Sequence, residues 1–130
     1  MTSPSDLDPF AAAWVAGAQA SLRGFDWPDA SGPRAKVDEE LRELDEAMAE
    51  GPSEAVASEL GDVLFALVNL ARHLGISPGA AVEGTRRRFE QRLAWVEDGL
   101  RSEGRRLSDA DPSELEARWQ AAKRALSKKA

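Results

Sequence analysis

The sequence predicts an all-α protein with a four-helix-bundle-like core of about five helices, and three observations lead to it. Apolar side chains recur three and four residues apart in five segments, the spacing that places them on one face of a helix. Glycine and proline stand between these segments as breaks. At 130 residues the chain is long enough for one hydrophobic core and too short for two, so we expect a single domain over residues 1–130.

The first two expected helices flank a loop rich in proline and glycine. The first helix runs from about residue 7 to residue 23 and ends before Gly24. The second starts near Pro33 or Arg34 and stops before Gly51. Its apolar stripe consists of Val37, Leu41, Leu44 and Met48.

The third expected helix is the most apolar segment of the chain. It begins at Pro52, continues to about Leu74 and ends at Gly75. Apolar residues cover most of its circumference: Val56, Leu60, Val63, Leu64, Phe65, Leu67, Val68 and Leu70. A helix of this kind is expected to be buried nearly everywhere, which in so small a domain favours a tight homodimer or a higher homo-oligomer.

Two further helices complete the expected fold. Ser77 and Pro78 open the fourth helix, with serine as its cap, and Gly104 breaks it. Residues 105–111 form a loop, and the last helix begins at Pro112.

Composition excludes several classes of function. A formal net charge of -6 argues against a nucleic-acid partner, because proteins that bind nucleic acids do so through a basic surface. The chain has no cysteine, so disulfide and thiol chemistry are excluded. No leader sequence is visible at the N-terminus, and no apolar run is long enough to cross a bilayer, so we expect no membrane partner and a cytoplasmic location.

Two pairs of acidic residues predict a metal site. Glu40 and Glu43 lie on one face of the second expected helix, and Glu59 and Asp62 lie on one face of the third. Four carboxylates brought together repel one another unless a cation lies among them. Oxygen ligands without Cys or His suit Mg²⁺, with Mn²⁺ as the alternative ion. On spacing alone, solvated helix faces remain the other interpretation.

Other polar residues also have two interpretations. Arg88 and Arg92 share a face of the fourth helix, either as solvated ion-pair partners or as ligands of phosphate oxygens. His73, the only histidine, fits a capping or packing role better than a ligand role. A single histidine also excludes a ferritin-like di-iron bundle, which needs a Glu-x-x-His pattern on each of two helices.

These motifs in order resemble the MazG family of all-α nucleoside triphosphate pyrophosphohydrolases. The resemblance covers nearly the whole chain and rests on five stretches: Gly24-Phe25-Asp26-Trp27-Pro28, Lys36-Val37-x-Glu39-Glu40-x-x-Glu43, Glu59-Leu60-Gly61-Asp62-Val63-Leu64-Phe65-Ala66, Asn69-Leu70-Ala71-Arg72-His73-Leu74-Gly75 and Arg88-Phe89-Glu90-x-Arg92. A single E-x-x-E is a weak signal, whereas all five stretches in order are a strong one.

The resemblance implies a Mg²⁺-dependent enzyme that cleaves nucleoside triphosphates between the α and β phosphates, releasing a monophosphate and pyrophosphate, with a house-cleaning role in the nucleotide pool. Carried over by position, the metal-binding and catalytic residues are Glu40, Glu43, Glu59 and Asp62, the phosphate contacts are Lys36, Arg88 and Arg92, and the nucleotide contacts are Asn69 and Trp119. Arg88 stands where the family often has lysine.

Several alternatives stay open beside this expectation. Trp119 can pack on a core instead of stacking on a base, and the aromatic residues Phe25 and Trp27 can close one end of the bundle instead of facing a nucleotide. Glu39 is a candidate general base, but the sequence does not assign that role. The alternative function is a non-catalytic helical dimerisation or regulatory module that binds a nucleotide or a cation.

Overall fold

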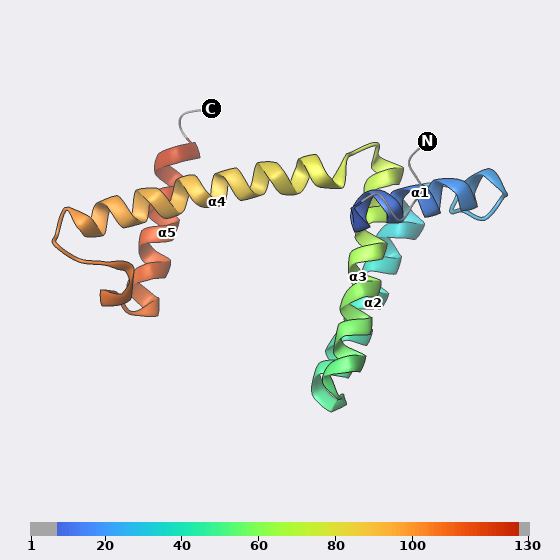
Figure 1. Cartoon of the computed structure of the whole chain (residues 1–130), viewed down its shortest axis with the longest axis horizontal. Helices are drawn as coiled ribbons and strands as arrows, with labels where there is room; N and C mark the ends of the chain where they lie inside the picture. Colours follow the sequence, from blue (N-terminus) through green and yellow to red (C-terminus); the bar gives the residue numbers. More distant parts are fainter. Residues whose placement is uncertain (1–7, 128–130) are drawn as a thin grey trace. The chain divides into compact units, whose positions relative to one another are not determined.

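The computed structural model of the chain describes residues 8–127, which contain five α-helices, one short 3-10 helix and no β-strand (Figure 1). The elements are α1 (Pro9–Leu22), α2 (Ser31–Glu50), α3 (Ser53–Leu74), α4 (Pro78–Arg101), η2 (Leu107–Asp109) and α5 (Pro112–Ser127). The all-α class and the five helices are thereby confirmed. The expected helix start at residue 7 lies outside the described residues.

The chain divides into two compact units, one ending at Ala81 and one beginning at Val82. The division into two units does not test the expectation of a single domain over residues 1–130, which remains a prediction. Within the described residues, every helix is too short or too polar to cross a membrane.

In the first unit, α2 and α3 run side by side as a helical hairpin (Figure 1). Gly51 and Pro52 form the short connection, so the two helices are antiparallel. The buried apolar side chains of the pair include Val37 from α2 and Val63 and Val68 from α3. Helix α1 packs against α3 and completes this unit.

Two glycines end their helices as the sequence predicts. Gly75 after α3 and Gly104 after α4 have φ angles of 69° and 72°, the left-handed region where a side chain is strained. At each site the next residue donates its N–H back into the helix: Ile76 to the Ala71 carbonyl and Arg105 to the Leu100 carbonyl, both at 2.9 Å.

The second unit has its own small core. The buried residues Val96, Leu100 and Ala122 join α4 to α5, and Leu107, Leu115 and Trp119 pack around them.

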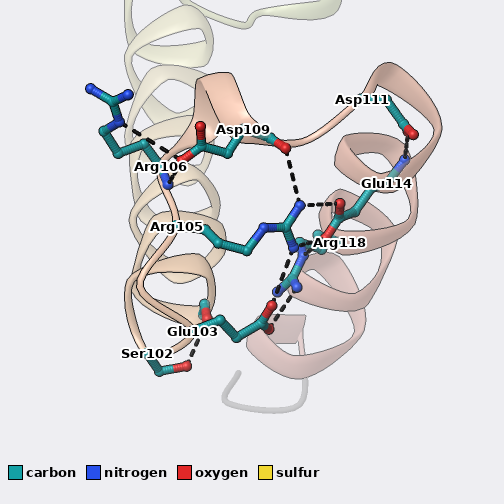
Figure 2. A network of polar contacts seen from close by, with 9 residues as sticks. Ser102, Glu103, Arg105, Arg106, Asp109, Asp111, Glu114 and Arg118 are labelled. Carbon is teal, nitrogen blue, oxygen red and sulfur yellow. Dashed lines mark hydrogen bonds and ion pairs between the residues drawn. The ribbon is translucent and has the colours of Figure 1, made fainter.

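A network of charged side chains covers the connection between α4 and α5 (Figure 2). Arg105 binds both carboxylate oxygens of Glu114, each at 2.6 Å, and Arg118 donates to the same carboxylate at 3.0 Å. Arg118 also donates to Glu103 at 2.7 Å. Because the network joins the turn after α4 to the first two turns of α5, it holds the start of α5 against that turn.

Candidate functional site

Three carboxylates from α2 and α3 lie close together in the first unit. Glu40 and Glu43 are one turn apart on α2, and Glu59 is on α3, so the helical hairpin brings the three together. One oxygen atom from each of them lies within 4.8 Å of the others. We call these three residues the acidic cluster.

The acidic cluster contains carboxylate oxygens that no described residue satisfies. The Glu40 side chain is buried, and its Oε1 lies 3.3 Å from Lys36 Nζ. Among residues 8–127, neither the second oxygen of Glu40 nor the buried Oε2 of Glu59 has a hydrogen-bond partner. Buried carboxylate oxygens without partners are costly, so this arrangement favours a bound cation.

The pKa values of two of the three carboxyl groups are raised. The pKa of Glu43 is raised, first by a hydrogen bond with the Glu40 carboxyl and then by the negative charge of Glu40. The pKa of Glu59 is also raised, first by burial and then by the charges of Asp62 and Glu40. Both shifts mean that the protein without a cation disfavours the fully ionised cluster.

Asp62 lies at the edge of the acidic cluster. It follows Glu59 by one turn of α3, and its negative charge is one cause of the raised pKa of Glu59. It is not among the three residues whose oxygens meet within 4.8 Å. The structure therefore brings together three of the four residues expected as ligands and places the fourth beside them; their role as metal ligands stays a prediction.

Lys36 connects the acidic cluster to Glu39. Its Nζ lies 2.7 Å from Glu39 Oε2 in addition to the Glu40 contact. These two carboxylates raise the pKa of Lys36, and the lysine in turn lowers the pKa of Glu39. Lys36 is thus a fixed positive charge at the margin of the cluster.

The other expected basic and aromatic residues belong to the second unit. Arg88 Nη2 donates to Thr85 Oγ1 at 3.1 Å, a neutral partner. By contrast, the neighbouring Arg86 forms ion pairs with Glu83 and Glu90. Arg92, half-buried on the same helix, has no carboxylate within ion-pair distance in the described part of the chain.

Trp119 packs inside the second unit. Its ring and that of Phe89 have centroids 5.3 Å apart at an interplanar angle of 51°. It also borders the core formed by Val96, Leu100 and Ala122. The packing role left open by the sequence is therefore present; a contact with a base stays a prediction.

A cavity of about 340 Å³ in the first unit was not predicted from the sequence. It lies among α1, α3 and the loop of residues 23–30, and Asn69 is part of its lining.

Asp26 joins the loop to the end of α3. Arg72 Nη2 donates to Asp26 Oδ1 at 2.8 Å, and His73 Nε2 lies at the same distance from that oxygen. The pKa of Asp26 falls far below its ordinary value, chiefly through the hydrogen bond from Arg72. The sequence does not predict the contact between Asp26 and Arg72, because the two residues are 46 positions apart and share no periodic pattern.

A family of known proteins matches the part of the chain that contains the acidic cluster. The family model described as phosphoribosyl-ATP pyrophosphohydrolase matches residues 25–89, which contain the acidic cluster, Asp62 and the cavity residue Asn69. The chain therefore belongs to this family of MazG-like proteins, and the predicted family is confirmed. Arg92 and Trp119 lie beyond the matched residues.

Two curated relatives have similar sequences. The chain is 38% identical over 104 residues to the nucleoside triphosphate pyrophosphohydrolase/pyrophosphatase MazG of Thermotoga maritima, covering 80% of this chain and 40% of that protein. It is 39% identical over 106 residues to the nucleoside triphosphate pyrophosphohydrolase of Escherichia coli K12, covering 78% and 39%. The chain thus spans about two fifths of the length of these relatives.

Proposed function

We propose that this protein hydrolyses nucleoside triphosphates between the α and β phosphates. Water adds at the α phosphorus and the α–β bridging bond breaks, giving a nucleoside monophosphate and pyrophosphate. The observation that carries the proposal is the convergence of buried, unpartnered carboxylate oxygens of Glu40 and Glu59 with Glu43. The names of the two relatives support the same reaction. We also propose a house-cleaning role in the nucleotide pool.

The acidic cluster fits a hard divalent cation, and we propose Mg²⁺, with Mn²⁺ as the alternative. All its donor atoms are carboxylate oxygens, the ligands that these ions prefer. Glu40, Glu43 and Glu59 would hold the ion, with Asp62 as a fourth ligand. A bound divalent cation supplies a lowered pKa for an attacking water and neutralises charge on the phosphate oxygens.

The remaining residues take roles that match their charge. Lys36 stays protonated because of its two carboxylate neighbours, so it offers a positive charge for a phosphate oxygen. Glu39 is a weak base because Lys36 lowers its pKa, so we assign it to hold Lys36 and not to take a proton. Arg88 and Arg92 are proposed phosphate contacts, and Asn69 and Trp119 are proposed nucleotide contacts.

A substrate panel tests the proposal directly. Each ribo- and deoxyribonucleoside triphosphate, and phosphoribosyl-ATP because the family description names it, is incubated with the protein and Mg²⁺ while pyrophosphate is measured. Pyrophosphate release from at least one nucleotide is expected. Binding of a triphosphate without pyrophosphate release from any of them would contradict the proposal and favour the non-catalytic nucleotide-binding module.

Substitution of Glu40 tests the assigned residues. Glu40→Gln keeps the size of the side chain but removes the charge of a buried ligand, so we expect turnover to fall by at least about 100-fold with unchanged helical content by circular dichroism. Asp45→Asn is the matched control, because it makes the same carboxylate-to-amide change at an exposed position of α2. Full activity in Glu40→Gln would contradict the proposed metal ligands.

A further inference from the structure

The cavity beside α3 has the size and lining of a ligand site. Its volume of about 340 Å³ lies within the range of about 300–1,000 Å³ that is typical of small-molecule pockets. Three aromatic side chains line it: Trp27 and Phe65 are about half exposed to solvent, and Phe25 is 83% exposed. Partly exposed aromatic faces around a cavity are suited to stacking on a flat ring.

One polar side chain of this cavity has a fixed orientation. Arg72 donates to Asn69 Oδ1 through both Nε, at 3.1 Å, and Nη2, at 2.8 Å. A guanidinium group has only donors, so the oxygen of the amide must face it, and the two donated bonds use both lone pairs of that oxygen. The Asn69 amino group is then the part of the amide that remains available, and it has no partner among residues 8–127.

The orientation is held from two further sides. Asp26 accepts a hydrogen bond from the same guanidinium at 2.8 Å and so restrains it. Gly17 on α1 leaves the space the pair needs, because a Cβ atom there would lie 3.1 Å from Arg72 Nε and 3.2 Å from Asn69 Oδ1. Asn69 is therefore a preset hydrogen-bond donor and cannot accept from a ligand without breaking the Arg72 contact.

The cavity lies within reach of a nucleotide held at the acidic cluster. Asn69 follows Asp62 by seven residues of α3, which is nearly two full turns and thus the same helix face, about 10 Å further along the axis. The sugar and phosphate chain of a nucleoside triphosphate spans a separation of this order.

We propose that this cavity binds the base and that Asn69 selects a base with a carbonyl group at the recognised edge. The amino group of Asn69 donates to a carbonyl such as O4 of uracil or O6 of hypoxanthine, and it rejects an exocyclic amino group at that place, which would leave two donors facing each other. Arg72 is a positioning residue, since it fixes which end of the amide faces the ligand. This inference rests on the proposed function.

Paired nucleotides that differ in that one group test the inference. UTP is compared with CTP and ITP with ATP, and the ratio of kcat/KM within a pair is measured in each protein. In the wild type the carbonyl member of at least one pair is expected to be favoured about tenfold. Because the ratio is taken within one protein, a general loss of activity in a variant cancels.

Asn69→Asp is the decisive variant. It replaces the amino group by an acceptor oxygen of equal size, while Arg72 keeps its partner. The ratio of kcat/KM for the carbonyl nucleotide to that for the amino nucleotide should therefore fall about tenfold. Arg72→Lys provides a second test, because one ammonium group cannot hold both lone pairs, and the ratio should approach one. Gln19→Glu, an amide-to-acid change at an exposed position of α1, is the matched control and should leave the ratio unchanged.

The outcomes separate this inference from the proposed function. Pyrophosphate release with ratios that are the same in the wild type, Asn69→Asp and Arg72→Lys overturns the inference and leaves the function standing. If no nucleotide yields pyrophosphate, the function fails, and calorimetric titration with the α,β-methylene analogues of UTP and CTP decides the inference. A preference for the UTP analogue that Asn69→Asp removes supports it, and equal binding overturns it.

Discussion

At the residue scale, the raised pKa values of Glu43 and Glu59 predict how stability depends on pH and on cations. Between their ordinary pKa of 4.5 and the raised value, the folded protein holds protons that the unfolded chain has lost. The free energy of unfolding therefore falls as pH rises through this window. We expect Mg²⁺ to reduce the fall, because it stabilises the ionised carboxylates.

Thermal unfolding between pH 4.5 and 8, with EDTA or with Mg²⁺, checks this prediction. The comparison is with the double variant Glu43→Gln, Glu59→Gln, whose two groups no longer titrate. In EDTA the unfolding midpoint of the wild type should decline relative to that of the double variant as pH rises above about 4.5. A constant difference between the two proteins across that range would show that these carboxylates carry no repulsion.

The sequence predicts the parts of the site whose residues are close together on one helix, but not the contacts between distant residues. Glu40 and Glu43 are three residues apart on one helix, so their common face follows from helix geometry alone. The contact between Asp26 and Arg72 depends on the path of a loop across the end of α3, which tertiary packing determines. Asn69 was expected to face the site, but the fixed direction of its amide required that contact to be seen.

At the scale of elements, the ion-pair network between the α4–α5 turn and α5 predicts the opposite dependence of stability on pH (Figure 2). Hydrogen bonds from Arg105 and Arg118 lower the pKa of Glu114 to about 2, from an ordinary 4.5. The ionised Glu114 carboxylate contributes fully to stability above pH 4.5, and this contribution is lost as pH falls through about 2. Glu114→Gln should therefore lower the unfolding midpoint at pH 7, and the difference from the wild type should vanish in acid.

Urea unfolding of the two proteins at pH 7, 4 and 1.5 measures this difference. Glu116→Gln is the control on the same helix, because Glu116 is exposed and its contact is with the neutral Gln120. That control should match the wild type at every pH. A Glu114→Gln midpoint equal to that of the wild type at pH 7 would mean that solvent screens the network completely.

Helix limits were more predictable than the contacts between helices. Gly75 and Gly104 end α3 and α4 because they adopt left-handed angles, and this signal is local. Helix α2 begins at Ser31, slightly earlier than expected, because its first turn tolerates Pro33, whose missing N–H would have no helical partner there. The pairing of Arg105 with Glu114 has no comparable local signal, since it depends on how the turn between the helices folds.

At the scale of the whole molecule, the apolar surface of α3 exceeds what the other helices of the first unit cover. Leu60, Leu64 and Leu67, which we call the leucine stripe, follow one another at spacings of four and three and are between 40% and 47% exposed. The sequence predicted a nearly fully buried helix, but a helix that is apolar all round does not reveal which face meets another subunit. Within the first unit, the structure leaves the leucine stripe as an uncovered face.

The leucine stripe predicts a homodimer, because a second copy presents the same stripe and the two can pair about a two-fold axis. Sedimentation equilibrium should give twice the chain mass of 14.1 kDa for the wild type. Leu64→Lys places a charge in the centre of the stripe and should shift the mass to that of one chain at the same concentration. Leu22→Lys makes the same change at a residue of α1 that is already 88% exposed, and it should remain dimeric. A wild-type protein that sediments as a single chain would show that the stripe tolerates water and that no second copy is needed.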